Sequence, residues 1–226
     1  ASSDNYDSEA LTDNGTCEWE NGLVESLSYE IYAEDGVSGT TTYRLYANFS
    51  SDDVEVTAAY GTDSDPWTIT PSTSLYQDAV GGPLAGGINP AFFGAFPSLE
   101  FDTWLTLGSA PGDPDGTNGA GMDAFYPAFE AGNALNVNTF LGGSIFVVPG
   151  QSTQTVPVDG KVLLAQITTD GTTAVKYNLQ IRNEQDESVQ IAGMELTFPQ
   201  VEVTGTGCTD LQALNFDPGA LLDDGT

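Results

Sequence analysis

The chain of 226 residues contains no histidine and only four basic residues, against 33 aspartates and glutamates, so its formal net charge is −29. The absence of histidine excludes Ser-His-Asp triads, Cys-His pairs, His-ligated zinc and the commonest general base near neutral pH. Four cations cannot form a basic patch that neutralises phosphates, so we expect no binding to nucleic acid or to anionic membranes. Divalent cations and positively charged partners are favoured instead.

Long apolar runs are also missing. We find no stretch of about 18 apolar residues and no basic segment followed by an apolar one, so we expect neither membrane insertion nor a retained signal peptide. The chain still has the composition of a folded protein, because 39% of its residues are hydrophobic and 10% are aromatic. Its length fits one large β domain or two small ones.

Several features favour an extracellular or cell-surface location. Lysine is scarce, Thr, Ser, Gly and Asp are abundant, and Asn14-Gly15-Thr16 and Asn48-Phe49-Ser50 fit the pattern of glycosylation acceptors. The tripeptides alone are weak indicators, because they also occur by chance.

The two ends of the chain match each other at a constant offset of 210 residues. The identical pairs are Asn5 and Asn215, Asp7 and Asp217, Ala10 and Ala220, Leu11 and Leu221, Asp13 and Asp223, Gly15 and Gly225, and Thr16 and Thr226. The position after Thr226 would correspond to Cys17. This pattern predicts one period of a tandem array, interrupted within its linker motif.

The C-terminal copy reads Cys208-Thr209-Asp210-Leu211-Gln212-Ala213-Leu214-Asn215-Phe216-Asp217-Pro218, followed by Asp223-Asp224-Gly225-Thr226. It resembles a short acidic Cys-to-Cys repeat, Cys-Thr-Asp-x-x-Ala-x-Asn-Tyr-Asp-Pro-x-Ala-x-x-Asp-Asp-Gly-Ser-Cys, of large secreted surface proteins of marine bacteria. The resemblance covers residues 1–17, which lack the opening cysteine, and 208–226, which lack the closing one. It divides the chain into the end of one linker repeat (1–17), a central domain (18–207) and the start of the next repeat (208–226).

The resemblance also bears on the two cysteines. It implies that Cys208 bonds to the equivalent of Cys17 in the following unit and closes a loop of about 20 residues. Such a disulfide would stabilise the folded state by roughly 3 kcal/mol. An internal bond between Cys17 and Cys208 is the alternative, because the ends of a sandwich can lie close together. Two free thiols would be unusual in an extracellular protein.

The acidic residues of both motifs have the spacing of calcium ligands. Oxygen-bearing side chains stand in two clusters on either side of a tight turn, which suits the six to eight ligands of Ca²⁺. The predicted ligands are Asn5, Asp7, Asp13 and Asn14 in one copy, and Asn215, Asp217, Asp223 and Asp224 in the other. Solvated turn residues are the alternative explanation.

The central domain shows the alternation of β-strands. In Tyr43–Phe49 the odd positions are apolar and the even ones polar, and Val54–Tyr60 repeats this period of two. Further strands are predicted at Leu23–Ala33, Trp67–Thr70, Leu75–Val80, Leu99–Leu107, Ser144–Val148, Lys161–Thr169, Ala174–Arg182 and Met194–Val203, with a helical turn at Asp123–Glu130. We therefore expect an all-β fold, a jelly-roll-like sandwich of two antiparallel sheets.

Two loops of this domain are unusual. Residues 81–97 are rich in Gly and Pro yet contain Phe92, Phe93 and Phe96, so the loop either covers an open end of the core or forms an interface with another unit. Residues 111–119 carry Asp113, Asp115 and Asn118, a weaker candidate for Ca²⁺ whose alternative is an empty polar turn.

Two other functions can be compared with these residues. Glu100 and Asp102, on one face of a predicted strand, resemble the Glu-x-Asp run of retaining glycoside hydrolases, but the further Glu that those families need is absent. A lectin-like module that binds surface glycans by stacking on Trp19, Trp67 or Trp104 is the stronger alternative.

The sequence thus favours a non-catalytic structural repeat unit of an extracellular fibre, stalk or adhesin. Its partners would be neighbouring copies, either in one tandem polypeptide or in a head-to-tail filament, joined by Ca²⁺-binding, disulfide-stapled linkers.

Overall fold

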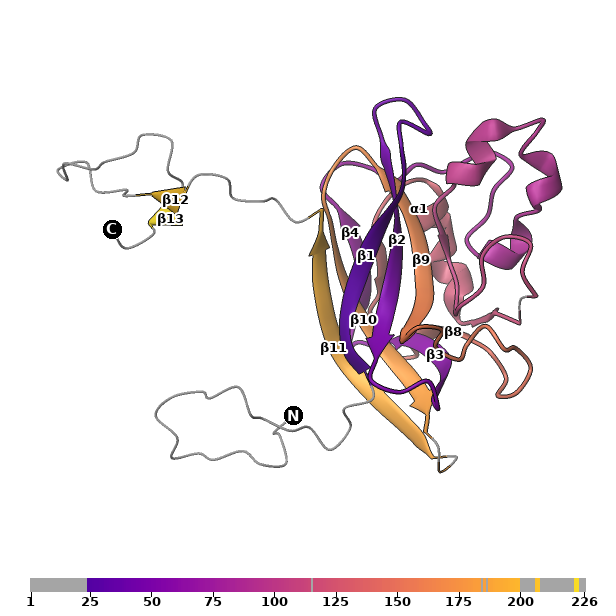
Figure 1. Cartoon of the computed structure of the whole chain (residues 1–226), viewed down its shortest axis with the longest axis vertical. Helices are drawn as coiled ribbons and strands as arrows, with labels where there is room; N and C mark the ends of the chain where they lie inside the picture. The colour runs from indigo at the N-terminus through magenta and orange to yellow at the C-terminus, as the bar shows by residue number, and fades with distance from the viewer. Residues whose placement is uncertain are drawn as a thin grey trace.

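The computed structural model describes residues 24–114, 116–183, 185 and 187–199, together with the backbone of residues 206–207 and 222–223. The predicted β-sandwich is confirmed: two antiparallel sheets pack face to face (Figure 1). Both cysteines and the predicted domain boundary at residues 17/18 lie outside the described residues, and the predicted boundary at 207/208 has only its first residue among them.

Sheet A has four strands. Their order is β1 (Val24–Glu34), β2 (Thr41–Phe49), β9 (Lys161–Thr169) and β5 (Trp104–Leu105). β1 and β2 form a hairpin, and β9 pairs with β2 from Thr41↔Thr169 to Asn48↔Lys161. The alternation in the sequence sets this register, because it turns Tyr43, Leu45 and Ala47 toward the other sheet.

Sheet B is organised around β10 (Thr173–Arg182). One edge of β10 pairs with β11 (Ser188–Phe198), and the other pairs with β3 (Glu55–Gly61) and β4 (Trp67–Pro71), one after the other along its length. Three short strands complete the sheet: β8 (Gly143–Phe146) beside β3, β7 (Leu135–Val137) beside β4, and β6 (Asn118–Ala120) beside β8.

The remaining elements are short. The predicted helical turn is present as η4 (Met122–Ala124) followed by α1 (Tyr126–Glu130). Three further 3-10 turns, η1 (Ala85–Gly87), η2 (Pro90–Phe92) and η3 (Pro97–Phe101), lie beside sheet A. A parallel pair joins β12 (Thr206–Gly207) to β13 (Leu222–Asp223).

Three predicted strands are wrong in whole or in part. In Leu75–Val80 only Leu75 forms a bridge, because the Asp78 carboxylate accepts a bond from the Val80 N–H and turns the chain. In Leu99–Leu107 the Pro97 ring favours the start of η3, and only Trp104–Leu105 is extended. β11 begins six residues before Met194, since a bulge containing Gly193 (φ 78°) interrupts its alternation.

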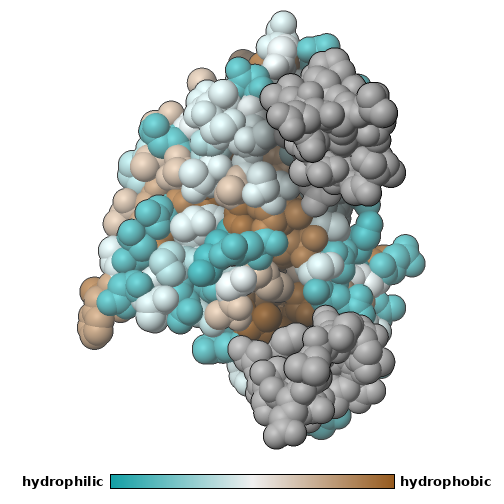
Figure 2. Space-filling view, turned by 90° about the vertical axis from the view of Figure 1, so that its left-hand side faces the viewer, coloured by the Kyte–Doolittle hydropathy of each residue, from teal (hydrophilic) through white to brown (hydrophobic). Residues whose placement is uncertain are grey.

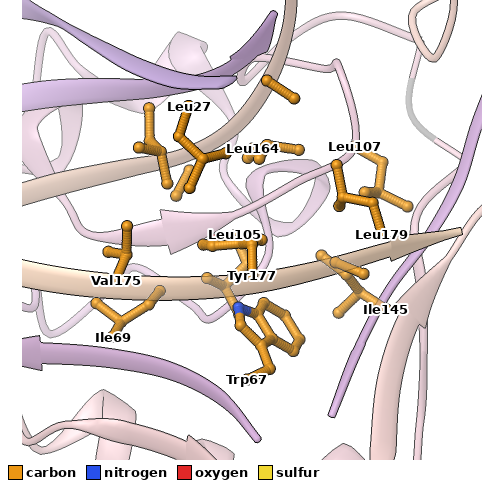
Figure 3. Close-up of a cluster of buried hydrophobic side chains, with 14 of the residues drawn as sticks. Leu27, Trp67, Ile69, Leu105, Leu107, Ile145, Leu164, Val175, Tyr177 and Leu179 are labelled. Carbon is orange, nitrogen blue, oxygen red and sulfur yellow. The ribbon is translucent and has the colours of Figure 1, made fainter. Parts of the chain in front are cut away.

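The main core lies between the two sheets. Figure 3 shows Leu27 and Leu164 of sheet A above Ile69 and Trp67 of sheet B, with Leu105 and Val175 between them. The Trp67 and Tyr177 rings lie 5.3 Å apart at 56°. Each sheet supplies one apolar face, and neither face would be stable in water without the other.

A second, smaller cluster lies on the outer face of sheet A. We call residues 78–102 the cover segment; it is drawn in magenta beside β9 in Figure 1. Its Ala85, Ile88 and Leu99 pack with Trp104 and Leu163 of sheet A, and this group forms the outer cluster. The Gly- and Pro-rich loop therefore builds a core of its own over a sheet face.

The two long edge strands, β1 and β11, lie on the same side of the sandwich. Within the described residues β1 pairs only with β2 and β11 only with β10, and Tyr29 of β1 stacks on Phe198 of β11 at 5.3 Å. Apolar surface gathers on this side (Figure 2), where Ile191, Met194 and Leu196 are half-buried. β1 begins near one end of this side and β11 ends toward the other (Figure 1).

A matched pair of leucines tests the core. Leu105→Ala removes a fully buried side chain and is expected to lower the free energy of unfolding by about 2–5 kcal/mol. Leu141→Ala, at a position that is 92% exposed, should change it by less than about 0.5 kcal/mol. Urea unfolding followed by circular dichroism measures both. Equal losses in the two variants would contradict the described packing.

Candidate functional site

The outer face of sheet A carries the most organised group of polar side chains that we find. Because Tyr43, Leu45 and Ala47 of β2 point into the main core, Arg44 and Tyr46 point outward. Glu30 of β1 pairs with Arg44, and Leu163 of β9 pairs with Tyr46. Two of the four basic residues of the chain, Arg44 and Lys161, thus lie on one sheet face.

Contacts on two sides fix the position of Arg44. Its guanidinium carbon lies 3.9 Å from the centre of the Tyr32 ring, and its Nε donates to Gln166 Oε1 at 3.3 Å. The Tyr32 hydroxyl donates to Glu100 Oε1 at 2.8 Å. Burial and the hydrogen bond to Glu100 raise the pKa of Tyr32. Arg44 is therefore held between β1 and β9, and Tyr32 links this pair to the cover segment.

Lys161 is paired on the same face. Its Nζ donates to Glu30 Oε1 at 2.7 Å and lies 5.5 Å from the centre of the Tyr46 ring. The hydrogen bond to Glu30, followed by the attraction of its charge, raises the pKa of Lys161, whereas burial raises that of Tyr46. The pair is largely solvent-exposed, so it orients the side chains more than it stabilises the fold.

These side chains line a cleft of about 480 Å³. Strands β1, β2 and β9 form its floor, and two loops, around residues 108–113 and 154–159, form its walls. The polar lining residues are Glu30, Arg44, Tyr46, Asp113, Gln154, Asp159 and Lys161. The lining includes both hydrogen-bond donors and acceptors, as well as apolar surface from Val156 and Val158.

Asp102 anchors the cover segment beside this face. Its buried carboxylate accepts hydrogen bonds from the Asp78 N–H at 2.7 Å and the Gly82 N–H at 3.1 Å. Gln166 Nε2 of β9 donates to the carbonyl oxygens of Glu100 and Asp102, both at 2.9 Å. A side chain at Gly81 would collide with the Asp102 carboxylate. Both ends of the segment are thus tied to buried polar groups.

The acidic groups around the segment have shifted pKa values. Burial raises the pKa of Asp102 to about 6, although the bonds from Asp78 and Gly82 oppose the shift. Burial and the charge of Asp102 raise the pKa of Glu130 to about 7. Burial would also raise the pKa of Asp78, but hydrogen bonds from Ser98, Val80 and Tyr76 together hold it below its usual value.

The predicted Glu100–Asp102 carboxylate pair is not on one face of a strand. Glu100 lies in η3 and accepts from Tyr32, while both Asp102 oxygens accept from backbone N–H groups. Buried and occupied in this way, Asp102 is a structural residue. The geometry assumed for a glycosidase-like pair is therefore wrong.

The predicted stacking of a glycan on tryptophan is also wrong for two of the three candidates. Trp67 lies in the main core and Trp104 in the outer cluster, and both are fully buried. Trp19 lies outside the described residues. Any aromatic contact with a ligand from the described part of the chain would have to come from tyrosine or phenylalanine.

Of the three phenylalanines of the cover segment, one is packed and two are exposed. Phe93 packs against the outer cluster, whereas Phe92 and Phe96 are 53% and 46% exposed. The segment therefore does cover apolar surface, and a contact between units through Phe92 and Phe96 stays a prediction.

Of the weaker calcium candidates, Asp113 and Asn118 form local turn contacts. Asp113 Oδ2 accepts from the Ala110 N–H at 2.9 Å, and Asn118 Nδ2 donates to the Gly116 carbonyl at 2.7 Å. Asp115 is outside the described residues. So are the motif residues Asn5, Asp7, Asp13, Asn14, Asn215, Asp217 and Asp224 and the side chain of Asp223, so calcium binding there stays a prediction.

The sequence did not lead us to predict the cleft. The alternation of β2 does place Arg44 and Tyr46 on the same outward face, and this was the available signal. Asp113, Gln154 and Asp159 lie far from β2 in the sequence, and only the paths of two irregular loops bring them there.

The anchoring role of Asp102 can be tested by substitution. Asp102→Ala leaves the N–H groups of Asp78 and Gly82 without their acceptor, which should cost about 2–4 kcal/mol of folding free energy. Hydrogen exchange should accelerate more in the cover segment than in β10. Asp63→Ala, an exposed position, is the control. If the Asp102 variant had the same free energy of unfolding as the wild type, the anchoring role would be contradicted.

The raised pKa values predict how stability depends on pH. Asp102 and Glu130 bind protons more tightly when folded, so they stabilise the fold fully below about pH 4 and lose this contribution as pH rises through 6 and 7. The melting temperature should therefore fall between pH 5 and pH 8. Glu130→Gln should flatten this slope, and Glu25→Gln, the same change at an exposed site, should not. Equal slopes in all three proteins would refute the assignment.

Comparison with protein-family models, with curated proteins and with solved structures finds no match to this chain. Within the described ranges no helix is long and apolar enough to cross a membrane.

Proposed function

We propose that the chain is a non-catalytic structural repeat unit of an extracellular or cell-surface fibre, stalk or adhesin. The observation that carries this proposal is the match between residues 5–16 and 215–226 at a constant offset. Tandem units joined by identical linkers produce such a match, whereas two unrelated ends of one globular domain have no reason to share it.

The path of the chain through the sandwich is compatible with serial connection. β1 and β11 lie on the same side, and the chain enters β1 near one end of that side and leaves β11 toward the other (Figure 1). Linkers attached at these two points can extend in opposite directions. Successive sandwiches can then follow one another in a row, because the chain does not have to turn back between units.

The C-terminal motif also has a backbone feature of its own. Thr206 pairs with Leu222 and Gly207 with Asp223 in a parallel bridge. This bridge brackets the segment that starts at Cys208, the same segment that a disulfide to the following unit would close. The pairing supports a small linker module, which a covalent staple would stabilise.

Charge supplies the argument for calcium. Eight of the 33 acidic residues lie in the 36 residues of the two motifs, which contain no lysine or arginine. When one unit follows another these carboxylates come together, and their repulsion opposes a compact junction. Bound Ca²⁺ would relieve it and stiffen the junction, so the array becomes a fibre in the presence of calcium and flexible without it.

The junction can be built and measured. Because Thr226 corresponds to Thr16, a two-unit chain should continue from residue 226 of the first unit to residue 17 of the second. Small-angle scattering of this protein is expected to show a longer, stiffer particle with calcium than with excess chelator. A maximum dimension that chelator leaves unchanged would rule out calcium stiffening.

Two variants of the same protein separate the causes. Asp217→Asn with Asp223→Asn in the first unit should abolish the effect of the chelator. Cys208→Ser in that unit should remove the disulfide predicted at the junction, seen as free thiols by mass spectrometry without reductant. It should leave the calcium response at least partly intact.

A further inference from the structure

We propose that the cleft on the outer face of sheet A binds an uncharged oligosaccharide. The proposal concerns a single unit and does not depend on how units are joined. The cleft holds about 480 Å³, within the range of about 300–1,000 Å³ that is usual for small-molecule sites. Its floor is formed by paired strands, which hold side chains in place better than loops do.

The lining matches the chemistry of sugar hydroxyl groups, each of which both donates and accepts hydrogen bonds. Lys161 Nζ and the Gln154 side chain supply donors, and the carboxylates of Glu30, Asp113 and Asp159 supply acceptors. Charged partners make stronger hydrogen bonds than neutral ones. Adjacent hydroxyls of one sugar ring would thus find both kinds of partner within the same cleft.

The apolar parts of the lining match the C–H faces of a sugar ring. Tyr46, which is half-buried, contributes part of an aromatic ring, and Val158 at the rim is 70% exposed, so both can offer apolar surface to a sugar ring. Tyrosine thereby takes the place that the buried Trp67 and Trp104 cannot fill.

Charge decides between neutral and acidic ligands. Three carboxylates and two cations line the cleft, and the whole chain carries a formal charge of −29. Lys161 is already paired with Glu30 at 2.7 Å. An acidic polysaccharide or a phosphate would meet net repulsion, whereas a neutral sugar meets none.

The cleft is also organised before any ligand arrives. Val158 and Lys161 exchange both backbone hydrogen bonds, at 3.0 and 3.1 Å, in a tight turn at the rim. Asp159 in that turn has φ 52°, and Gly160 is tied to Phe49 and Asp52. A fixed rim and a pinned Arg44 reduce the entropy lost on binding.

The test titrates the ¹⁵N-labelled 226-residue protein with short linear neutral oligosaccharides built from glucose, mannose, xylose or N-acetylglucosamine, followed by NMR. At least one should shift the amide signals of β2, β9 and residues 154–161. Lys161→Met is expected to weaken binding about tenfold or more, because it removes a charged donor but keeps the apolar stem. Asp159→Asn should weaken it less, since it keeps one acceptor and tolerates positive φ.

Lys176→Met is the matched control. It removes the same charge from the other sheet, where Lys176 faces Glu195 at 3.8 Å, and it should change affinity less than about twofold. Acidic polysaccharides should not bind. The proposal is overturned if no neutral sugar shifts these signals at about 10 mM, if acidic glycans bind instead, or if both lysine variants lose affinity equally.

Discussion

The hydrogen bonds that hold the cover segment against β9 determine which part of the outer face of sheet A is covered and which part stays open. One amide group, that of Gln166, bonds to two carbonyl oxygens at the end of the segment, and the Asp102 carboxylate bonds to two N–H groups at its beginning. These buried bonds hold a Gly- and Pro-rich chain in place, and the outer cluster can then form around Trp104. Without them the segment would have few regular hydrogen bonds to keep it there.

This anchoring gives sheet A two different outer halves. One half lies under the cover segment and is apolar, and the other carries Arg44, Tyr46 and Lys161 around the cleft. The halves are coupled, because Gln166 also accepts from Arg44, and Glu100 of the segment accepts from Tyr32. Gln166 and Glu100 therefore both hold the cover segment over the apolar half and fix the side chains of the polar half.

The sequence predicts the sandwich well where a strand faces the core on one side and water on the other. β2 and β10 show this alternation and lie close to their predicted positions. β3 and β9 also lie close to theirs, but β3 changes face at a bulge after Val56 and β9 is buried on both faces. It fails where backbone groups bond to side chains from distant parts of the chain. Asp102 looks like an exposed strand residue in the sequence, but its partners lie about 20 residues earlier. The cleft depends on two irregular loops, whose paths carry no periodic signal.

The charge of −29 is distributed differently over the sandwich and over the two terminal motifs. In the sandwich Lys161 and Lys176 pair with glutamates, Arg44 is enclosed by Tyr32 and Gln166, and Arg182 lies in a cleft beside Asp52, Asp53 and Glu55. All four cations of the chain therefore belong to this domain, and none lies in the terminal motifs. In the array proposed above, repulsion between carboxylates at a junction would then be relieved only by cations from solution. Because exposed charges are screened within about 10 Å at 0.1 M salt, monovalent ions would weaken that repulsion, whereas the compact junction of the proposed array would use a bound Ca²⁺ ion.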